Sequence, residues 1–322
     1  MIRKEVHAVK NILLFGDPGI DDTLAIIYAL LHPEINLIGI VCGYGNVSRK
    51  QTIQNTFYLL SLAERLDIPI IGGATRSLTG DVDDYYPEIH GPDGLGPIHP
   101  PEGLPSTLNN FSTIYEVISR YHDVTIVDVG RQTSLAAAYI LDSTIMNSVK
   151  EVFMMGGAFL VPGNVTPTAE ANFHGDPVAV NAVLANAPHV TITPLNVTNF
   201  AIIAPQDIRY ITEHSSFAFT HLLEPIHNYY FKAYQKLVPG IKGTPMHDVF
   251  TLWALMNPDK VRSVRRKVFV ETNLSDKGLS IADFRPLSSH EQTGKQQNII
   301  LQFDYSAFVA DFIRVMSGAS SI

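Results

Sequence analysis

The chain has 322 residues, of which 46% are hydrophobic and 17% are charged, a composition that allows a sizeable core and excludes a disordered chain. Its 31 acidic and 23 basic residues give a net charge of −8, which argues against broad electrostatic binding to nucleic acid. The one cysteine, Cys42, cannot form an internal disulfide, and no uncharged apolar run approaches the roughly 18 residues that span a bilayer, so we expect a cytoplasmic protein without a membrane segment.

Apolar stretches of strand length alternate with helical patterns along the first half of the chain. The opening "MIRKEVHAVKNILLF" leads into a first strand and does not have the pattern of a signal peptide. Continuous apolar strands separated by helices are typical of a parallel sheet covered on both faces. Strands are predicted at 11–16, 35–43, 68–73, 124–130 and 151–157, and helices at 22–31, 51–66, 111–122 and 133–142.

This alternation predicts an α/β fold with an open, mostly parallel, Rossmann-like sheet. Such sheets bind ligands outside the carboxyl ends of their strands, where we expect the active site. Two long irregular segments, 73–110 and 158–177, interrupt the pattern, and loops of this length are usually functional or disordered. After residue 205 the chain becomes more helical, with late strands predicted at 267–272 and 298–303. No repeat or linker is visible, so residues 1–322 are expected to form a single domain.

Three aspartates, Asp17, Asp21 and Asp22, follow the first predicted strand within six residues. Capping of the next helix by Asp21, with Asp22 complementing the helix dipole, explains two of them but leaves Asp17 without a role. Three neighbouring carboxylates repel one another unless a cation neutralises them, and hard cations select oxygen ligands. The stretch lacks the phosphate-binding pattern G-x-x-x-x-G-K-[ST]. We therefore favour a metal site over a phosphate site.

Two further polar stretches fit the same kind of site. His247 and Asp248 begin another helical pattern in "GTPMHDVFTLWALMNP", where Asp248 is either a cap or a further carboxylate ligand. The loop "GNVTPTAEANF" contains Asn164, Glu170 and Asn172, whose side chains suit a ligand rich in hydroxyl groups. Asn164 is equally compatible with a simple turn.

With these residues assembled, the sequence resembles the inosine–uridine nucleoside hydrolase family. The resemblance begins at "DPGIDDTLAI", similar to the aspartate-rich motif of the family, and covers most of the chain in the expected order. The matching stretches that follow are "GNVS", "HGPDGLG", "MGGAF", "GNVTPTAEANFHGDP", "HDVF" and "ETNLSDKG".

The resemblance implies a role for each matching residue. It implies a Ca²⁺ site, a ribonucleoside substrate and a homodimer or homotetramer. In the implied mechanism a general base activates water, the N-glycosidic bond is cleaved with inversion, and a group near the departing base supplies acid assistance. The implied metal ligands are Asp17, Asp22, Asp248 and the carbonyl of Thr133; the base is Asp21; the ribose ligands are Asn46, Asn164, Glu170 and Asn172; and His247 and His90 lie near the nucleobase, with His247 as the acid.

The chain departs from the family pattern at several positions. Phe15 stands where the family usually has another aspartate, Arg131 and Ser134 alter the usual "GPLTN", and Ala171 replaces an aromatic residue. These departures leave the implied metal ligands in place and bear on substrate preference and loop geometry. Two other functions compete: a Mg²⁺-dependent phosphatase or phosphotransferase, which would need a D-x-D arrangement that Gly19 interrupts, and a non-catalytic nucleoside-binding protein.

Overall fold

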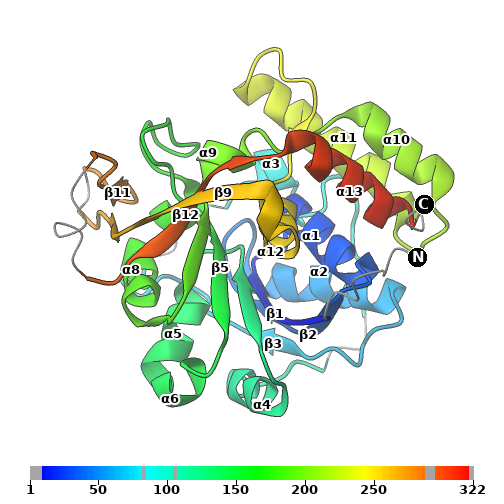
Figure 1. Cartoon of the computed structure of the whole chain (residues 1–322). Coiled ribbons are helices and arrows are strands. Elements are labelled where there is room, and N and C mark those ends of the chain that lie inside the picture. Colours follow the sequence, from blue (N-terminus) through cyan, green and yellow to red (C-terminus); the bar gives the residue numbers. More distant parts are fainter. Residues whose placement is uncertain (1–8, 82–84, 104–106, 274, 287–293, 319–322) are drawn as a thin grey trace, which may run out of the picture.

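A central sheet with helices on both faces forms the core of the computed structural model, which describes residues 9–81, 85–103, 107–273, 275–286 and 294–318 (Figure 1). The first eight residues of the expected opening and one residue of "ETNLSDKG" lie outside the described part. The strands run in the order β3 (Ile70–Gly72), β2 (Ile35–Cys42), β1 (Lys10–Gly16), β4 (Thr125–Asp128), β5 (Glu151–Met155), β6 (Val190–Thr193), β12 (Gln297–Phe303) and β9 (Val261–Arg266). All neighbours pair in parallel except β12 and β9, which confirms the predicted mostly parallel α/β sheet.

The side chains of β1 show how the sheet divides the core. Ile12 and Leu14 pack on one face, and Leu13 and Phe15 pack on the other, because successive residues of a strand point to opposite sides. The first face is covered by α1 (Ile20–Leu31), α2 (Arg49–Leu62), α9 (Leu195–Thr198), α10 (Pro205–His214), α11 (Thr220–Leu237), α12 (His247–Met256) and α13 (Tyr305–Ser317). The second is covered by α4 (Thr113–Arg120), α5 (Thr133–Leu141), α6 (Ser143–Met146), α7 (Ala171–Gly175) and α8 (Pro177–Asn186).

Several short elements connect these layers. They are α3 (Pro87–His90), the 3₁₀ helix η1 (Pro258–Lys260), the two-stranded sheet of β7 (Ile202–Ile203) and β8 (Thr244–Pro245), and that of β10 (Val268–Val270) and β11 (Ser280–Ala282). Cys42 is buried, as expected from its apolar surroundings. Among the residues described, no helix combines the length and the apolar character needed to cross a lipid bilayer.

Candidate active site

The carboxyl ends of adjacent strands bring two of the expected polar residues, Asp17 and Asn46, together with a third polar residue, Asp128. Asp17 directly follows β1, Asn46 lies in the loop after β2, and Asp128 is the last residue of β4. Asp17 Oδ2 accepts a hydrogen bond from the backbone N–H of Asn46 at 2.7 Å, so the loop after β2 is fastened to the end of β1. Parallel strands end at the same edge of the sheet, which is why residues so far apart in the sequence meet here.

Three buried carboxylates form a cluster at this edge. Asp21 and Asp22 lie in the first turn of α1, and Asp248 lies in the first turn of α12. One oxygen from each lies within 4.8 Å of the others, so the group could hold a metal ion. Asp17 is next to this group and not part of it, although the resemblance names Asp17, and not Asp21, as a ligand.

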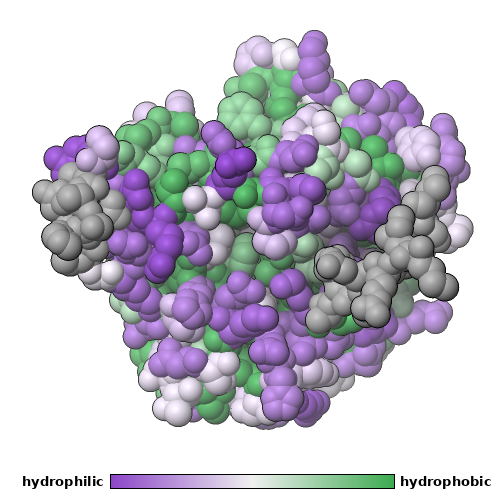
Figure 2. Space-filling view, viewed as in Figure 1, coloured by the Kyte–Doolittle hydropathy of each residue, from purple (hydrophilic) through white to green (hydrophobic). Residues whose placement is uncertain are grey.

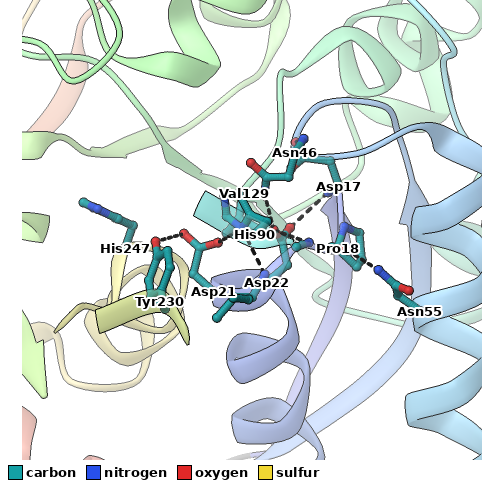
Figure 3. A network of polar contacts seen from close by, with 12 residues as sticks. Asp17, Pro18, Asp21, Asp22, Asn46, Asn55, His90, Val129, Tyr230 and His247 are labelled. Atoms are coloured by element: carbon teal, nitrogen blue, oxygen red, sulfur yellow. Dashed lines mark hydrogen bonds and ion pairs between the residues drawn. The ribbon is translucent and has the colours of Figure 1, made fainter. Parts of the chain in front are cut away.

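Asp22, and not Asp21, carries the capping role at the start of α1. Its Oδ1 accepts the backbone N–H of Asp17 at 3.0 Å, and its Oδ2 accepts the N–H of Gly19 at 3.1 Å and the amide of Asn46 at 2.9 Å. This leaves Asp21 available for other contacts. Figure 3 shows Asp21 between Tyr230 and His90.

The contacts of Asp21 leave one oxygen without a hydrogen bond. Its Oδ2 accepts the hydroxyl of Tyr230 at 3.2 Å, whereas its buried Oδ1, 3.8 Å from His90 Nδ1, has no hydrogen-bond partner among the described residues. Within the same part of the chain, Asp17 Oδ1 is also buried without a hydrogen-bond partner. Buried carboxylate oxygens in this condition are unfavourable unless a cation or a proton compensates them.

The electrostatics of the cluster agree with a cation site. Burial raises the pKa of Asp17 to about 7; the charge of Arg131 opposes this rise and that of Asp21 adds to it. Burial also raises the pKa of Asp22 and of Asp248, and the neighbouring carboxylates raise both further. All the candidate ligand atoms are oxygens, two of them lack a hydrogen bond within the described residues, and the carboxylates repel one another. These three features fit a hard divalent cation.

His247 uses both ring nitrogens. Its Nδ1 is hydrogen-bonded to the hydroxyl of Thr198 at 2.8 Å, and its Nε2 to the hydroxyl of Tyr234 at 2.8 Å. Burial lowers the pKa of His247 to about 4, while the charge of Asp21 opposes this shift. Tyr234 also packs edge-on against Tyr230, with ring centroids 4.8 Å apart. A chain of hydrogen bonds therefore leads from Thr198 through His247 to the hydroxyl of Tyr234.

A cavity of about 530 Å³ opens over the cluster. Of the predicted site residues, it is lined by Asp21, Asn46, His90, Asn164, Glu170, Asn172, His247 and Asp248. Asp17, Asp22 and Thr133 are not among the lining residues. Further lining residues, for which no role was predicted, include Tyr86, Phe200, Tyr230 and Tyr234. The three tyrosines of α11 lie at helical spacing, which predicts packing as readily as binding, so this pattern alone could not identify Tyr230 and Tyr234.

The turn between β4 and α5 leads into Thr133, the first residue of α5. Asp128 Oδ1 accepts the N–H of Gly130 at 3.0 Å, and the side-chain amide of Gln132 donates to the carbonyl of Gly130. The hydroxyl of Thr133 donates to Asp176 at 2.7 Å. Burial raises the pKa of Asp128 to about 8. Asp128 and Gln132 thus fix this turn from both sides, a function that the sequence did not reveal.

Arg131 is a buried cation beside this turn. Its guanidinium lies 5.0 Å from the ring centroid of Tyr44 and 5.9 Å from that of Tyr86, and it donates to the carbonyl of Gly45 at 3.2 Å. Its charge acts to lower the pKa of both Asp17 and Glu170. Arg131, which departs from the family pattern, therefore places a positive charge near the buried carboxylates of Asp17 and Glu170.

The comparisons with known proteins agree with this geometry. The family model for inosine-uridine preferring nucleoside hydrolase matches residues 12–310. Uridine nucleosidase 1 of Arabidopsis thaliana is 31% identical over 284 residues, covering 84% of this chain and 83% of that protein. The pyrimidine-specific ribonucleoside hydrolase RihA of Klebsiella pneumoniae is 32% identical over 305 residues, covering 92% and 95%.

A solved structure extends the likeness to the whole fold. The purine-preferring ribonucleoside hydrolase of Gardnerella vaginalis superposes with a TM-score of 0.88 at 27% identity, covering 96% of this chain and 98% of that one. These named relatives are enzymes that cleave N-glycosidic bonds. With a family match over most of its length and relatives above 30% identity, this chain belongs to the inosine-uridine preferring nucleoside hydrolase family.

Proposed function

We propose that this protein hydrolyses the N-glycosidic bond of ribonucleosides, releasing the free base and ribose with inversion, and that it does so with Ca²⁺ bound. The observation that carries the proposal is the buried carboxylate cluster that opens into a cavity lined by amide side chains. The relatives named for uridine, for pyrimidine ribonucleosides and for purine ribonucleosides support this substrate class. They favour it over a phosphatase and over a non-catalytic binding protein.

The proposed ligands of the ion are the carboxylates of Asp17, Asp22 and Asp248 and the carbonyl of Thr133. Ca²⁺ takes six to eight oxygen ligands in flexible geometry, so these groups leave positions for hydroxyl groups and water. A bound ion would supply the positive charge that polarises water and ribose hydroxyls. The capping bonds of Asp22 and the Asn46 N–H bond of Asp17 hold these two carboxylates in fixed orientations.

Asp21 is the proposed general base. It lines the cavity, and in the part of the chain that the structure describes its Oδ1 has no hydrogen-bond partner with which an attacking water would compete. The Tyr230 hydroxyl on Oδ2 fixes the orientation of the carboxylate. Asp21 can therefore take a proton from a water at the anomeric carbon, a contribution of typically ~10²–10⁴-fold.

Three amide side chains are proposed to hold the ribose. Asn46, Asn164 and Asn172 line the cavity and come from three separate loops or helices. Each amide both donates and accepts, which suits hydroxyl groups. Asn164 Oδ1 accepts the N–H of Ala171 at 3.0 Å, and the Asn172 amide donates to the carbonyl of Val129 at 3.0 Å, so both are oriented before substrate binds.

The departing base is proposed to receive its proton with the help of His247. Because both nitrogens of His247 are hydrogen-bonded to hydroxyls, it reaches the leaving group through Tyr234. His90 is a second donor beside the base: its Nδ1 accepts the N–H of Ile20 at 3.1 Å, so the neutral ring carries its proton on Nε2. Both histidines line the cavity.

Separate substitutions test these two proton-transfer roles. Asp21→Asn should lower kcat on inosine and on p-nitrophenyl riboside alike by ~10²–10⁴-fold, because both reactions need an activated water. Tyr234→Phe should slow inosine far more than p-nitrophenyl riboside, whose leaving group departs without a proton. Equal losses on both substrates for Tyr234→Phe would refute the relay, and unchanged kcat for Asp21→Asn would refute the base.

A further inference from the structure

Phe200 is an exposed aromatic residue on the wall of the cavity. It lines the 530 Å³ cavity, yet it is 64% exposed, compared with 2% for Phe159. Two further apolar lining residues, Leu237 at 57% and Val238 at 48%, are also exposed. Figure 2 shows hydrophobic surface near the top of the molecule, where the end of α11 and the following loop project in Figure 1. Exposed apolar surface around a hollow is typical of a ligand-binding groove.

The backbone around Phe200 is held rigidly against the helix that carries His247. The N–H of Phe200 donates to the carbonyl of Val197 at 3.0 Å, and the N–H of Met246 donates to the carbonyl of Ala201 at 2.9 Å. Directly afterwards β7 pairs with β8, which leads into α12. Thr198, two residues before Phe200, is hydrogen-bonded to His247. The backbone of Phe200 is therefore held in place relative to the proposed proton relay.

One part of the cavity lining is mainly polar and another is mainly apolar. The carboxylate and amide side chains come mainly from the loops and helix ends that follow the strands of the central sheet, where the ribose is proposed to bind. A group of six apolar side chains comes from residues 200–202, β8 and the end of α11 with the loop that follows. This second group contains Phe200, Ile202, Leu237, Val238, Ile241 and Pro245. Ile89, Val129, Met155 and Val165 are further apolar residues of the lining, outside this group.

A nucleobase is the part of a ribonucleoside that suits this second group. It offers two apolar faces for stacking and a polar edge that the hydroxyl and imidazole groups near His247 can meet. Stacking on an aromatic ring tolerates any base, because every base has a π face. Its strength grows with the area covered, so a two-ring purine gains more than a one-ring pyrimidine.

We propose that Phe200 is a specificity-determining residue whose ring forms one face of the nucleobase subsite. Its contact adds binding in proportion to the size of the base and leaves the proton transfers unaffected. This inference rests on the proposed ribonucleoside hydrolysis. It predicts that Phe200 lowers the KM for purine ribonucleosides more than the KM for pyrimidine ribonucleosides.

Steady-state kinetics of Phe200→Ala with inosine and uridine test the inference. The KM for inosine should rise by roughly 5- to 160-fold, the range for losing one stacking contact. The KM for uridine should rise by a smaller factor, and kcat for both should stay within about twofold. Phe200→Trp should restore the KM for inosine, and inhibition by D-ribose, which has no base, should be unchanged in Phe200→Ala.

A matched control is Phe269→Ala, which removes an exposed phenylalanine, 46% accessible, from β10, outside the cavity lining. It should leave both KM values unchanged. An unchanged KM for inosine in Phe200→Ala, an equal rise for inosine and uridine, or a loss of kcat alone would overturn the inference. If the unmodified protein releases base from neither nucleoside, the proposed function itself fails, and this outcome is distinguishable from the others.

Discussion

Gly45 lies so close to the Asp17 carboxylate that no side chain fits between them. A Cβ at position 45 would lie 1.6 Å from Asp17 Oδ2, the oxygen that accepts the Asn46 N–H. Close approaches recur nearby: a Cβ on Gly16 would lie 2.7 Å from Asp22 Oδ1, and one on Gly19 would lie 2.8 Å from the Asn46 amide nitrogen. These glycines allow backbone and carboxylates to pack into one small volume.

Gly45→Ala should therefore displace Asp17 without unfolding the protein. We expect Ca²⁺ affinity, measured by calorimetric titration of metal-free protein, to fall ~10–100-fold, the usual cost of disturbing the support of a metal ligand. Gly43→Ala is the matched control in the same loop, since its Cβ would find its nearest atom at a comfortable 3.5 Å. Unchanged Ca²⁺ affinity in Gly45→Ala would argue against Asp17 as a ligand.

At the scale of elements, Glu170 joins α7 to the end of β5. Its Oε1 accepts the N–H of Asn172 at 2.8 Å, and its Oε2 accepts the N–H groups of Gly157 at 2.9 Å and Phe173 at 3.1 Å. The family resemblance implied that Glu170 is one of the ribose ligands. The structure gives it a capping role as well, and through that role it positions Asn172.

Glu170→Ala should accordingly lower both stability and substrate binding. Loss of a cap costs ~0.5–2 kcal/mol, and a buried N–H left without a partner adds to this cost. We therefore expect the free energy of unfolding, measured by urea denaturation, to fall by about 1–3 kcal/mol. The KM for uridine should rise because Asn172 loses its anchor. Asp304→Ala is a matched cap loss at α13, where Asp304 accepts the N–H of Ala307 at 3.0 Å; it should lower stability alone. A normal KM in Glu170→Ala would contradict this positioning role.

The elements that the sequence predicted are those with strong local signals. β1 is an apolar run followed by aspartates, and α1 begins at Ile20, two residues before the predicted start, with the Asp22 side chain accepting the N–H of Gly19 at its N-terminus. β9 was not predicted because its sequence, VRSVRR, alternates basic residues along an edge strand, where charge is tolerated. The position of β12 between β6 and β9 depends on long-range pairing that no local pattern specifies.

The same limit explains the parts of the site that were not predicted. Tyr230 reaches Asp21 across 209 positions of sequence, and Thr198 reaches His247 across 49. A sequence pattern records residue types and spacing, so it identified the aspartates and amides but not the partners that orient them. The sequence showed that Arg131 departs from the family pattern. Its contacts with the rings of Tyr44 and Tyr86, however, follow only from the fold.

For the molecule as a whole, the buried acids predict how stability depends on pH when metal is removed. Burial raises the pKa of Asp17 to about 7 and that of Asp128 to about 8, well above the values near 4 of unfolded aspartate. Between pH 7.5 and 8.5 the folded state thus holds protons that the unfolded state has lost, and stability falls as pH rises. This window begins about one unit above the unfolded pKa of histidine, so the buried histidines contribute little to the slope there.

The melting temperature of metal-free protein in chelator should therefore decrease from pH 7.5 to 8.5. Saturating Ca²⁺ should raise the melting temperature more at pH 8.5 than at pH 7.5, because the ion binds the ionised carboxylates. A melting temperature that increases with pH in chelator, or a Ca²⁺ effect that shrinks with pH, would be inconsistent with a buried acidic metal site.

The most direct test of the whole account is to measure free base and ribose released from uridine, inosine and 2′-deoxyuridine, with Ca²⁺ and after chelation. We predict release from both ribonucleosides with Ca²⁺, loss of release after chelation, and recovery when Ca²⁺ is returned. The kcat/KM for 2′-deoxyuridine should be far below that for uridine, because a site built to bind a hydroxyl rejects a substrate that lacks it. Absence of base release from any ribonucleoside by the Ca²⁺-loaded protein, or equal kcat/KM for uridine and 2′-deoxyuridine, would contradict the account.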